Sequence, residues 1–207
     1  TPDATYIASR ARSSTVGGAR LAVRVTRNGL VNLNLGNTGT STGNSASTGI
    51  SADGSVLYGL GNGLGQAFRF TAAGPTATPI PFLQVGDNQN APTARGVSAD
   101  GSVMVGTSVG ASTPRAYRYV HGVGVTALPL LPGGTWSRAT AITPDGFVTL
   151  LIGNSSQFPT GEVYRHDARD GISNPIPKDS QQLSPGYHRI IFHLPDSYGE
   201  ILSIVGQ

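Results

Sequence analysis

The chain has 207 residues and a net charge of +3, and 38% of its residues are hydrophobic while 12% are charged. It contains 29 Gly and 14 Pro, which serve turns, whereas long exposed helices normally carry more charge, so many short strands are favoured over helices. Disulfide bonds and thiolate metal sites are excluded because there is no cysteine, and the sequence has neither an apolar run long enough for membrane insertion nor the basic and aromatic clusters of nucleic-acid binders.

A turn motif recurs five times along the chain. Asp is followed by Gly in GISADGSVLYG (49–59), GVSADGSVMVG (96–106) and AITPDGFVTLLIG (141–153), and degenerate copies lie at 1–9 and 194–206. Asp accepts hydrogen bonds from nearby amides and Gly adopts a positive φ, so each copy is expected to form the turn of a β-hairpin. The structural residues of this motif are Asp53, Gly54, Asp100, Gly101, Asp145 and Gly146.

A second motif, with Arg at its centre, alternates with the first. It reads LAVRVTRNG (21–29), QAFRFTAAG (66–74), RAYRYVHGVG (115–124) and EVYRHDARDG (162–171). In QAFRFT, alternation along a strand places Ala67, Arg69 and Thr71 on one face and Phe68 and Phe70 on the other. A turn and a further strand usually follow each copy. The central arginines are Arg24, Arg69, Arg118 and Arg165.

Both motifs repeat with a period of about 47 residues, which assigns two hairpins and four strands to each repeat. We therefore predict an all-β, β-propeller-like fold of tandem four-stranded repeats, with a β-solenoid as the alternative. The chain forms a single domain, 1–207, with repeat units at approximately 3–52, 53–99, 100–144 and 145–195 and a partial fifth copy at 196–207. Because Thr1 lies inside a repeat, we expect the chain to be a piece of a longer one.

The motif AxGVSADGSVxVG, followed by AFRFT, a glycine turn and a Leu-rich strand, resembles the HAF-type extracellular repeat. The resemblance extends over nearly the whole chain and is best at 47–146. Repeats of that family occur in tandem in secreted and autotransporter-like surface proteins of bacteria. The resemblance implies a propeller-like architecture and a place outside the bacterial cell or on its surface, and it carries no catalytic motif.

Two roles are open for the four arginines and the turn aspartates. In register, the guanidinium groups would form one surface that binds carboxylates or acidic sugars. Alternatively, each Arg pairs with a turn aspartate or a carbonyl of a neighbouring hairpin and joins the repeats. We favour the structural role, because the feature recurs in every repeat and a half-buried guanidinium needs a partner.

Candidate ligand-binding residues lie in the polar connections between repeats. Trp136 is the only tryptophan and precedes the third intact Asp motif. An indole stacks on the C–H face of a sugar and amides bind its hydroxyls, although Trp136 could instead cap the edge of a repeat core. The residues that we select for ligand binding are Trp136, Asn88, Gln89, Asn90 and Asn44.

The sequence offers weak candidates for catalysis and metal binding, and we predict no catalytic residue, metal or cofactor. GTSVG (106–110) matches the nucleophile-elbow pattern through Ser108, but a strand rather than a helix is expected to follow. His188 and His193 are five residues apart, which places them on opposite faces of a strand. HDARDG (166–171) lacks the full alternation of acids in a calcium loop.

The sequence therefore predicts a non-enzymatic binding or adhesion module of a bacterial cell-surface or extracellular protein, with a glycan or a surface protein as ligand. One alternative is a structural segment that self-associates through strand edges. Another is a polysaccharide-acting lyase or hydrolase that uses loop residues.

Overall fold

The computed structural model describes residues 5–12, 20–26, 28–32, 45–61, 66–71, 74–83, 93–109, 113–176, 187–193 and 200–206. All regular structure in these ranges is β: seventeen strands form five antiparallel sheets. No helix in this part of the chain is long and apolar enough to cross a bilayer.

The sheets follow one another in chain order, and each is a meander of neighbouring strands. Sheet 1 contains β1 (Tyr6–Arg12), β2 (Arg20–Thr26) and β3 (Gly29–Asn32). Sheet 2 contains β4 (Ser45–Ile50), β5 (Val56–Gly61), β6 (Gln66–Thr71) and β7 (Gly74–Pro79). Sheet 3 contains β8 (Thr93–Val97), β9 (Val103–Val109), β10 (Pro114–Val120) and β11 (Gly124–Ala127). Sheet 4 contains β12 (Ser137–Ile142), β13 (Val148–Gly153), β14 (Glu162–Asp167) and β15 (Ile172–Pro175), and sheet 5 contains β16 (Tyr187–His193) and β17 (Glu200–Gly206).

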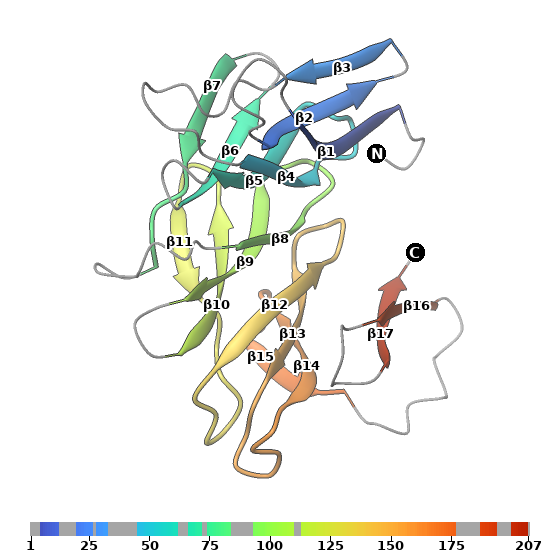
Figure 1. Cartoon of the computed structure of the whole chain (residues 1–207). Coiled ribbons are helices and arrows are strands. Elements are labelled where there is room, and N and C mark those ends of the chain that lie inside the picture. The colour runs from blue at the N-terminus through green and yellow to red at the C-terminus, as the bar shows by residue number, and fades with distance from the viewer. Residues whose placement is uncertain are drawn as a thin grey trace.

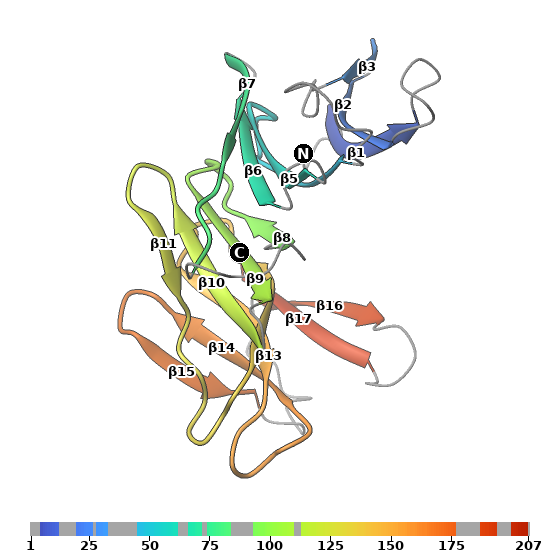
Figure 2. The same cartoon turned by 60° about the vertical axis from the view of Figure 1, so that its left-hand side comes forward.

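The four-stranded sheets are arranged like the blades of a propeller. Their first strands, β4, β8 and β12, lie toward the inside of the curved path that the sheets follow, whereas β7 and β11 lie on its outer side (Figures 1 and 2). The predicted all-β, propeller-like fold is therefore confirmed, and the β-solenoid alternative is wrong, because sheets 2, 3 and 4 are each a separate four-stranded antiparallel sheet.

The sheets are offset from the repeat units by one strand. The unit 53–99, for example, contains β5, β6 and β7 of sheet 2 together with β8 of sheet 3. The Asp turn lies between the first and second strands of a sheet, and the central Arg lies on the third strand. Each repeat unit therefore spans the interface between two successive sheets, which we call a joint. Its Asp and Arg motifs lie near these joints.

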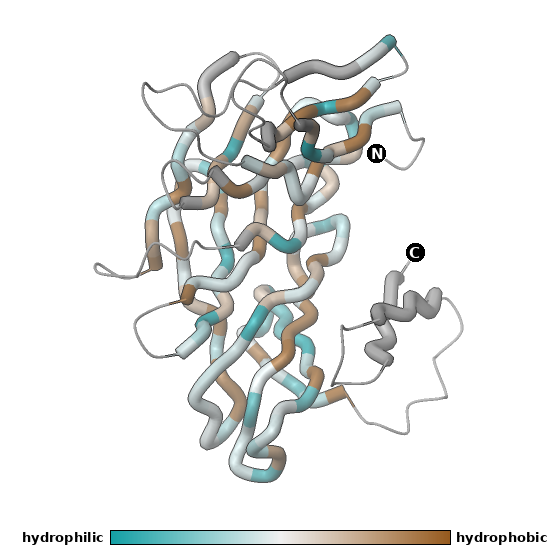
Figure 3. Tube along the Cα trace, in the orientation of Figure 1, coloured by the Kyte–Doolittle hydropathy of each residue, from teal (hydrophilic) through white to brown (hydrophobic). Residues whose placement is uncertain are grey.

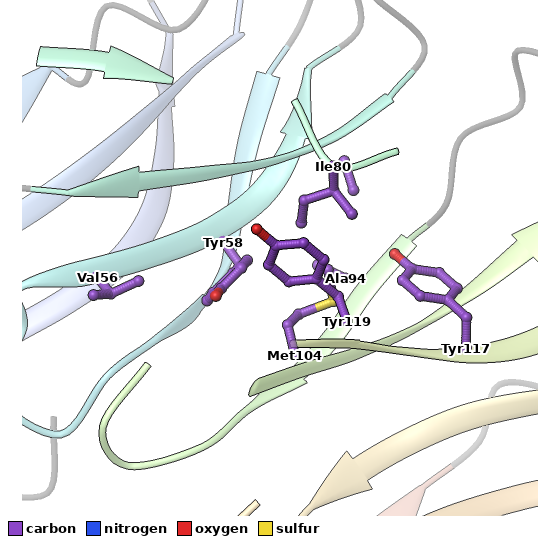
Figure 4. Packing of buried hydrophobic residues seen from close by; sticks show 8 residues of the cluster. Val56, Tyr58, Ile80, Ala94, Met104, Tyr117 and Tyr119 are labelled. Atoms are coloured by element: carbon purple, nitrogen blue, oxygen red, sulfur yellow. The ribbon is translucent and has the colours of Figure 1, made fainter. Parts of the chain in front are cut away.

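Hydrophobic residues recur along the strands (Figure 3), and the buried ones form clusters between successive sheets. Between sheets 2 and 3, Tyr58 meets Tyr119 edge to face, with ring centroids 6.2 Å apart. Met104 fills the space beside these rings (Figure 4) and is fully buried. The core of this protein therefore lies between its sheets, as a series of similar layers.

The first strand of each four-stranded sheet contains a β-bulge at the same repeat position. The register with the second strand shifts around Thr48, Arg95 and Thr140, which are the extra residues. A bulge of this kind bends the strand and increases its twist. The hydroxyl of Thr140 donates to the carbonyl of Leu150 at 3.0 Å, so this extra residue is bound to its own sheet.

The glycine of each Asp turn approaches the preceding sheet closely. Gly54, Gly101 and Gly146 have φ angles of 73°, 69° and 77°. A Cβ atom at Gly101 would also lie 2.6 Å from the Cβ of Val56, and one at Gly54 would lie 2.3 Å from Cδ2 of Tyr6. Glycine is therefore required here both by the left-handed backbone and by the contact between sheets.

These two requirements can be separated with a matched pair of variants. Gly122 has a φ of 80° with no atom within 4 Å of an added Cβ, so Gly122→Ala should cost about 1 kcal/mol from the backbone alone. Gly101→Ala should cost about 1–3 kcal/mol more, because it also overpacks the joint with Val56. Urea unfolding measures both values, and equal losses of stability would contradict the close approach.

Candidate functional site

The three described Asp turns share a pattern of hydrogen bonds, in which the third has one hydroxyl donor fewer because Phe147 stands where the others have serine. In the first described copy, the Ser51 hydroxyl donates to Asp53 Oδ1 at 2.6 Å, and the amide and hydroxyl of Ser55 donate to the same oxygen at 3.0 and 2.8 Å. The Ser51 hydroxyl oxygen in turn accepts from the amide of Val56 at 2.9 Å. Ser98–Asp100 and Thr143–Asp145 repeat this arrangement.

The donors around each carboxylate favour its charged form. Hydrogen bonds from Ser51 and Ser55 lower the pKa of Asp53 to about 2, and those from Ser98 and Ser102 lower the pKa of Asp100 to about 2. The pKa of Asp145 is also lowered, mainly by the hydroxyl of Thr143. The aspartates thus act as acceptors that fix the turns. In each of them, Oδ1 is the oxygen that accepts these hydrogen bonds.

Successive turns are joined by main-chain hydrogen bonds. The amide of Ala52 donates to the carbonyl of Ala99 at 2.7 Å, and the amide of Ala99 donates to the carbonyl of Pro144 at 2.8 Å. Pro144 has no amide hydrogen, so it cannot donate to a further turn in the same way. The amides of Ala22 and Ala116 add a second kind of joint, since they donate to the hydroxyls of Ser45 and Ser137 at the start of the following sheet.

The repeated arginines contact carbonyl oxygens of the following turn. Arg24 Nη1 donates to the carbonyl of Gly54 at 3.0 Å, and Arg118 Nη2 donates to the carbonyl of Gly146 at 3.0 Å. Burial lowers the pKa of Arg118, as expected for a guanidinium that is partly removed from water. These two side chains join sheet 1 to sheet 2 and sheet 3 to sheet 4.

Arg69 reaches the following sheet through a tyrosine. Its Nε donates to the hydroxyl of Tyr58 at 3.2 Å, and that hydroxyl donates to the carbonyl of Gly101 at 2.8 Å. Burial raises the pKa of Tyr58 to about 12, so the hydroxyl keeps its proton for this bond. Arg165 is exposed, and no described residue accepts a hydrogen bond from it.

Trp136 lies at the opposite end of the sheets from the Asp turns, immediately before β12. The amides of Thr135 and Trp136 both donate to Asn154 Oδ1, at 2.8 and 3.0 Å, and Asn154 Nδ2 donates to the hydroxyl of Thr135 at 3.1 Å. The six-membered ring of the indole lies against Gly161, where an added Cβ would be 3.1 Å from Cζ2. Asn154 thus fixes the backbone at Trp136, Gly161 lies against one part of the indole, and Trp136 stays partly exposed.

Other sequence candidates have structural surroundings. Ser108 is 1% exposed and lies within β9, opposite Arg115 of β10, so it is a strand residue and does not sit on the strand-to-helix turn of a nucleophile elbow. In HDARDG, Asp167 binds Arg169 through Nε at 2.9 Å and Nη2 at 2.5 Å. The described residues contain no group of three or more His, Asp or Glu side chains placed to hold a metal.

Several candidates lie outside the described residues. They are Asn44, Asn88, Gln89 and Asn90, together with the turn aspartates Asp3 and Asp196. His188 and His193 lie on β16 and pair in register with Val205 and Glu200 of β17. Among the described candidates, the structure brings the Asp turns and three arginines together and separates them from Trp136.

Sequence reasoning missed Asn154, Gly161 and Tyr58. Asn154 follows β13 and acts at a position 18 residues earlier in the chain, and Gly161 acts through its lack of a side chain. No local pattern marks either residue. A signal did exist for Tyr58, because it is the largest side chain in GISADGSVLYG and replaces the valine of the next copy, Val105.

No family model matches the chain, and no curated protein matches it either. Solved structures do resemble it. TolB from Acinetobacter baumannii matches with a TM-score of 0.63 and 17% sequence identity, over 98% of this chain and 50% of that one. A puromycin-hydrolysing peptidase of Mycobacterium tuberculosis matches with a TM-score of 0.57 and 13% identity, over 99% of this chain and 33% of that one. The chain spans about half the length of that TolB, and identities this low establish the fold alone.

The low pKa values of the turn aspartates predict acid sensitivity. A carboxylate whose folded pKa is about 2 stabilises the fold above its unfolded value of 3.8, and this contribution is lost as the pH falls toward 2. Asp100→Asn keeps an acceptor oxygen but removes the charge, so it should lower Tm at pH 5 and flatten the fall of Tm between pH 5 and pH 2. Thermal unfolding followed by circular dichroism measures this, and a variant with the wild-type pH slope would contradict the assignment.

Proposed function

We propose that this chain is a non-enzymatic binding module of a bacterial cell-surface or extracellular protein, and that it binds a glycan at the end of the sheets that carries Trp136. The observation that carries the proposal is that Trp136 is partly exposed, with its backbone held by Asn154 and its indole packed beside Gly161. A side chain that is already ordered in the free protein loses little conformational entropy when a sugar stacks on it, so less binding free energy is lost to ordering the site.

The neighbourhood of Trp136 has the chemistry that a sugar requires. Thr135 and Asn154 are polar neighbours of Trp136, and the exposed Ser156, Gln157 and Thr160 belong to the connection between β13 and β14. In sequence, Asn44 precedes β4 and Asn88, Gln89 and Asn90 precede β8, as Trp136 precedes β12. We propose that these amides extend the same binding surface.

The proposed location in the bacterial envelope rests on two independent points. The chain has a fold like that of TolB proteins from two bacteria, Acinetobacter baumannii and Agrobacterium tumefaciens. Its repeats also resemble the HAF-type extracellular repeat in the residues around Asp53 and Asp100. The finer placement, at the surface or outside the cell, belongs to this proposal.

The enzymatic alternative has less support. Ser108, the one residue that matched a nucleophile motif, is buried within a strand, and Asp167 is bound to Arg169.

The test uses the single tryptophan as its own reporter. The chain is screened on an array of neutral and acidic polysaccharides, and the best binder is titrated against the fluorescence of Trp136. We expect a saturable change in emission and at least roughly tenfold weaker array binding for Trp136→Ala, because the stacking surface is removed. Phe147→Ala is the matched control, since Phe147 is an aromatic residue 42% exposed in the turn at the other end of sheet 4.

The proposal is contradicted by a blank array, or by binding that Trp136→Ala leaves intact and Phe147→Ala removes. The second result would move the site to the end that carries the Asp turns. Turnover of a polysaccharide during the screen would replace the proposal with the enzymatic alternative.

A further inference from the structure

Charged residues are distributed unevenly between the two ends of the sheets. The aspartates that the structure describes all lie at the end that carries the Asp turns; they are Asp53, Asp100, Asp145, Asp167 and Asp170. The one ion pair of the described residues, between Arg169 and Asp167, lies at that end too. Negative charge is thus gathered at the end of the sheets that is remote from Trp136.

The end that carries Trp136 is basic. In the described parts of sheets 1 to 4, the arginines at the ends of the strands on this side are Arg12, Arg20, Arg115 and Arg138. One acid, Glu162 at the start of β14, accompanies them, and its Oε1 accepts a hydrogen bond from the hydroxyl of Ser155. The described residues therefore place an excess of positive charge at this end.

Two of these arginines lie close to Trp136 along the chain or across a joint. Arg138 follows Trp136 by two residues, is exposed, and makes no hydrogen bond to a described residue. Arg115 belongs to β10 of the preceding sheet, where the amide of its neighbour Ala116 donates to the hydroxyl of Ser137 at 3.0 Å. The backbone at Arg115 is therefore held beside the segment that contains Trp136 and Arg138.

Arg115 has hydrogen-bond donors that no described residue uses. Its Nε is buried and has no acceptor within the described part of the chain. Arg24 and Arg118 also have an unpaired Nε, but each donates through a terminal nitrogen to a turn carbonyl. Burial raises the pKa of Tyr164 on β14, and the positive charge of Arg115 opposes this rise, so that charge acts across the joint on sheet 4.

The exposure of both positions is independent of which sheets lie at the two ends of the row. Arg115 belongs to sheet 3, which has a described sheet on either side. Arg138 is the second residue of the first strand of its sheet, and Ala46 is the second residue of the first strand of sheet 2. Ala46 is partly exposed although sheet 3 follows it. A following sheet therefore leaves this position open to solvent.

We propose that the glycan bound at the Trp136 end is anionic, and that Arg138 and Arg115 bind its carboxylate or sulfate groups while the indole stacks on a sugar ring. This inference rests on the proposed function and names its class of ligand. A guanidinium presents several donors in a planar fork that matches such groups. The basic end attracts a polyanion and the acidic end repels it, which favours binding beside Trp136.

The test compares two matched pairs of polymers, polygalacturonate with its fully methyl-esterified form and dextran sulfate with dextran. The wild type should bind the charged member of a pair more tightly, and this advantage should shrink between about 50 and 200 mM salt because salt screens exposed charges. The first pair tests a carboxylate as the group that is bound, and the second pair tests a sulfate.

Arg138→Gln should weaken binding of the charged polymer by at least about tenfold, as expected for the loss of a hydrogen bond from a charged group. Binding of the uncharged polymer should stay the same. Arg115→Gln should act in the same direction. Since Arg138 is exposed, its variant should keep the wild-type Tm, so the test stands on Arg138→Gln even where Arg115→Gln is less stable.

Arg165→Gln is the matched control. It removes the same charge from an exposed position in the middle of β14 of the same sheet, so it should bind every polymer like the wild type. Equal losses of affinity in Arg138→Gln and Arg165→Gln would overturn the proposal, because net charge alone would then explain the binding.

The remaining outcomes separate this inference from the proposed function. Equal binding of the charged and uncharged members of both pairs, weakened by Trp136→Ala, would overturn the anionic ligand and leave the glycan-binding module in place. Binding of no polysaccharide at all would overturn both proposals. A single-stranded oligonucleotide that binds as tightly as the best polysaccharide would also overturn the inference, because the site would then recognise charge without a sugar polymer.

Discussion

The approach of each Asp–Gly turn to the sheet before it is the contact on which the rest of this structure depends. At Gly101, the turn lies close enough to Val56 to leave no room for a Cβ, and the neighbouring residue Ala99 accepts a main-chain hydrogen bond from Ala52. Such a contact fixes the distance and the rotation between two sheets. The clusters of apolar residues then fill the space that this geometry leaves, and the repeated period of the sequence follows from the repeated joint.

The arginines complete the joint from the outer side of the sheets. A carbonyl at a tight turn has few internal donors, and a guanidinium carried on the third strand of the preceding sheet reaches it from across the joint. Arg69 uses Tyr58 as an intermediate and arrives at the same kind of carbonyl. The aspartates are occupied by donors of their own turns, so the charge of the arginine meets a backbone dipole and no carboxylate. The described Asp turns and three arginines thus hold successive sheets together at one end of the sheets, and Trp136 lies at the other end.

The sequence was sufficient for the fold class and for the positions of the turns, because Asp and Gly act there through local hydrogen bonds and a local backbone angle. It was insufficient where a residue acts on a distant one. Asn154 holds Thr135 and Trp136, and the bulges contain Thr48, Arg95 and Thr140, which are not all of one residue type. The offset between repeat units and sheets also escaped the sequence, since a period has no natural starting point. In the site proposed for ligands, Trp136 was selected from the sequence. Its contacts with Asn154 and Gly161 could be identified only from the structure.

The most direct test of the joint compares two arginines in the same part of the chain. Arg118 donates across the joint to Gly146, whereas Arg138 is exposed on β12 and makes no hydrogen bond to a described residue. Chemical unfolding of Arg118→Ala should show a loss of about 1.5–3 kcal/mol, the range for a hydrogen bond of a charged group, while Arg138→Ala should stay within about 0.5 kcal/mol of the wild type. Equal effects of the two substitutions would contradict the account, because the repeated arginine would then contribute nothing to holding one sheet against the next.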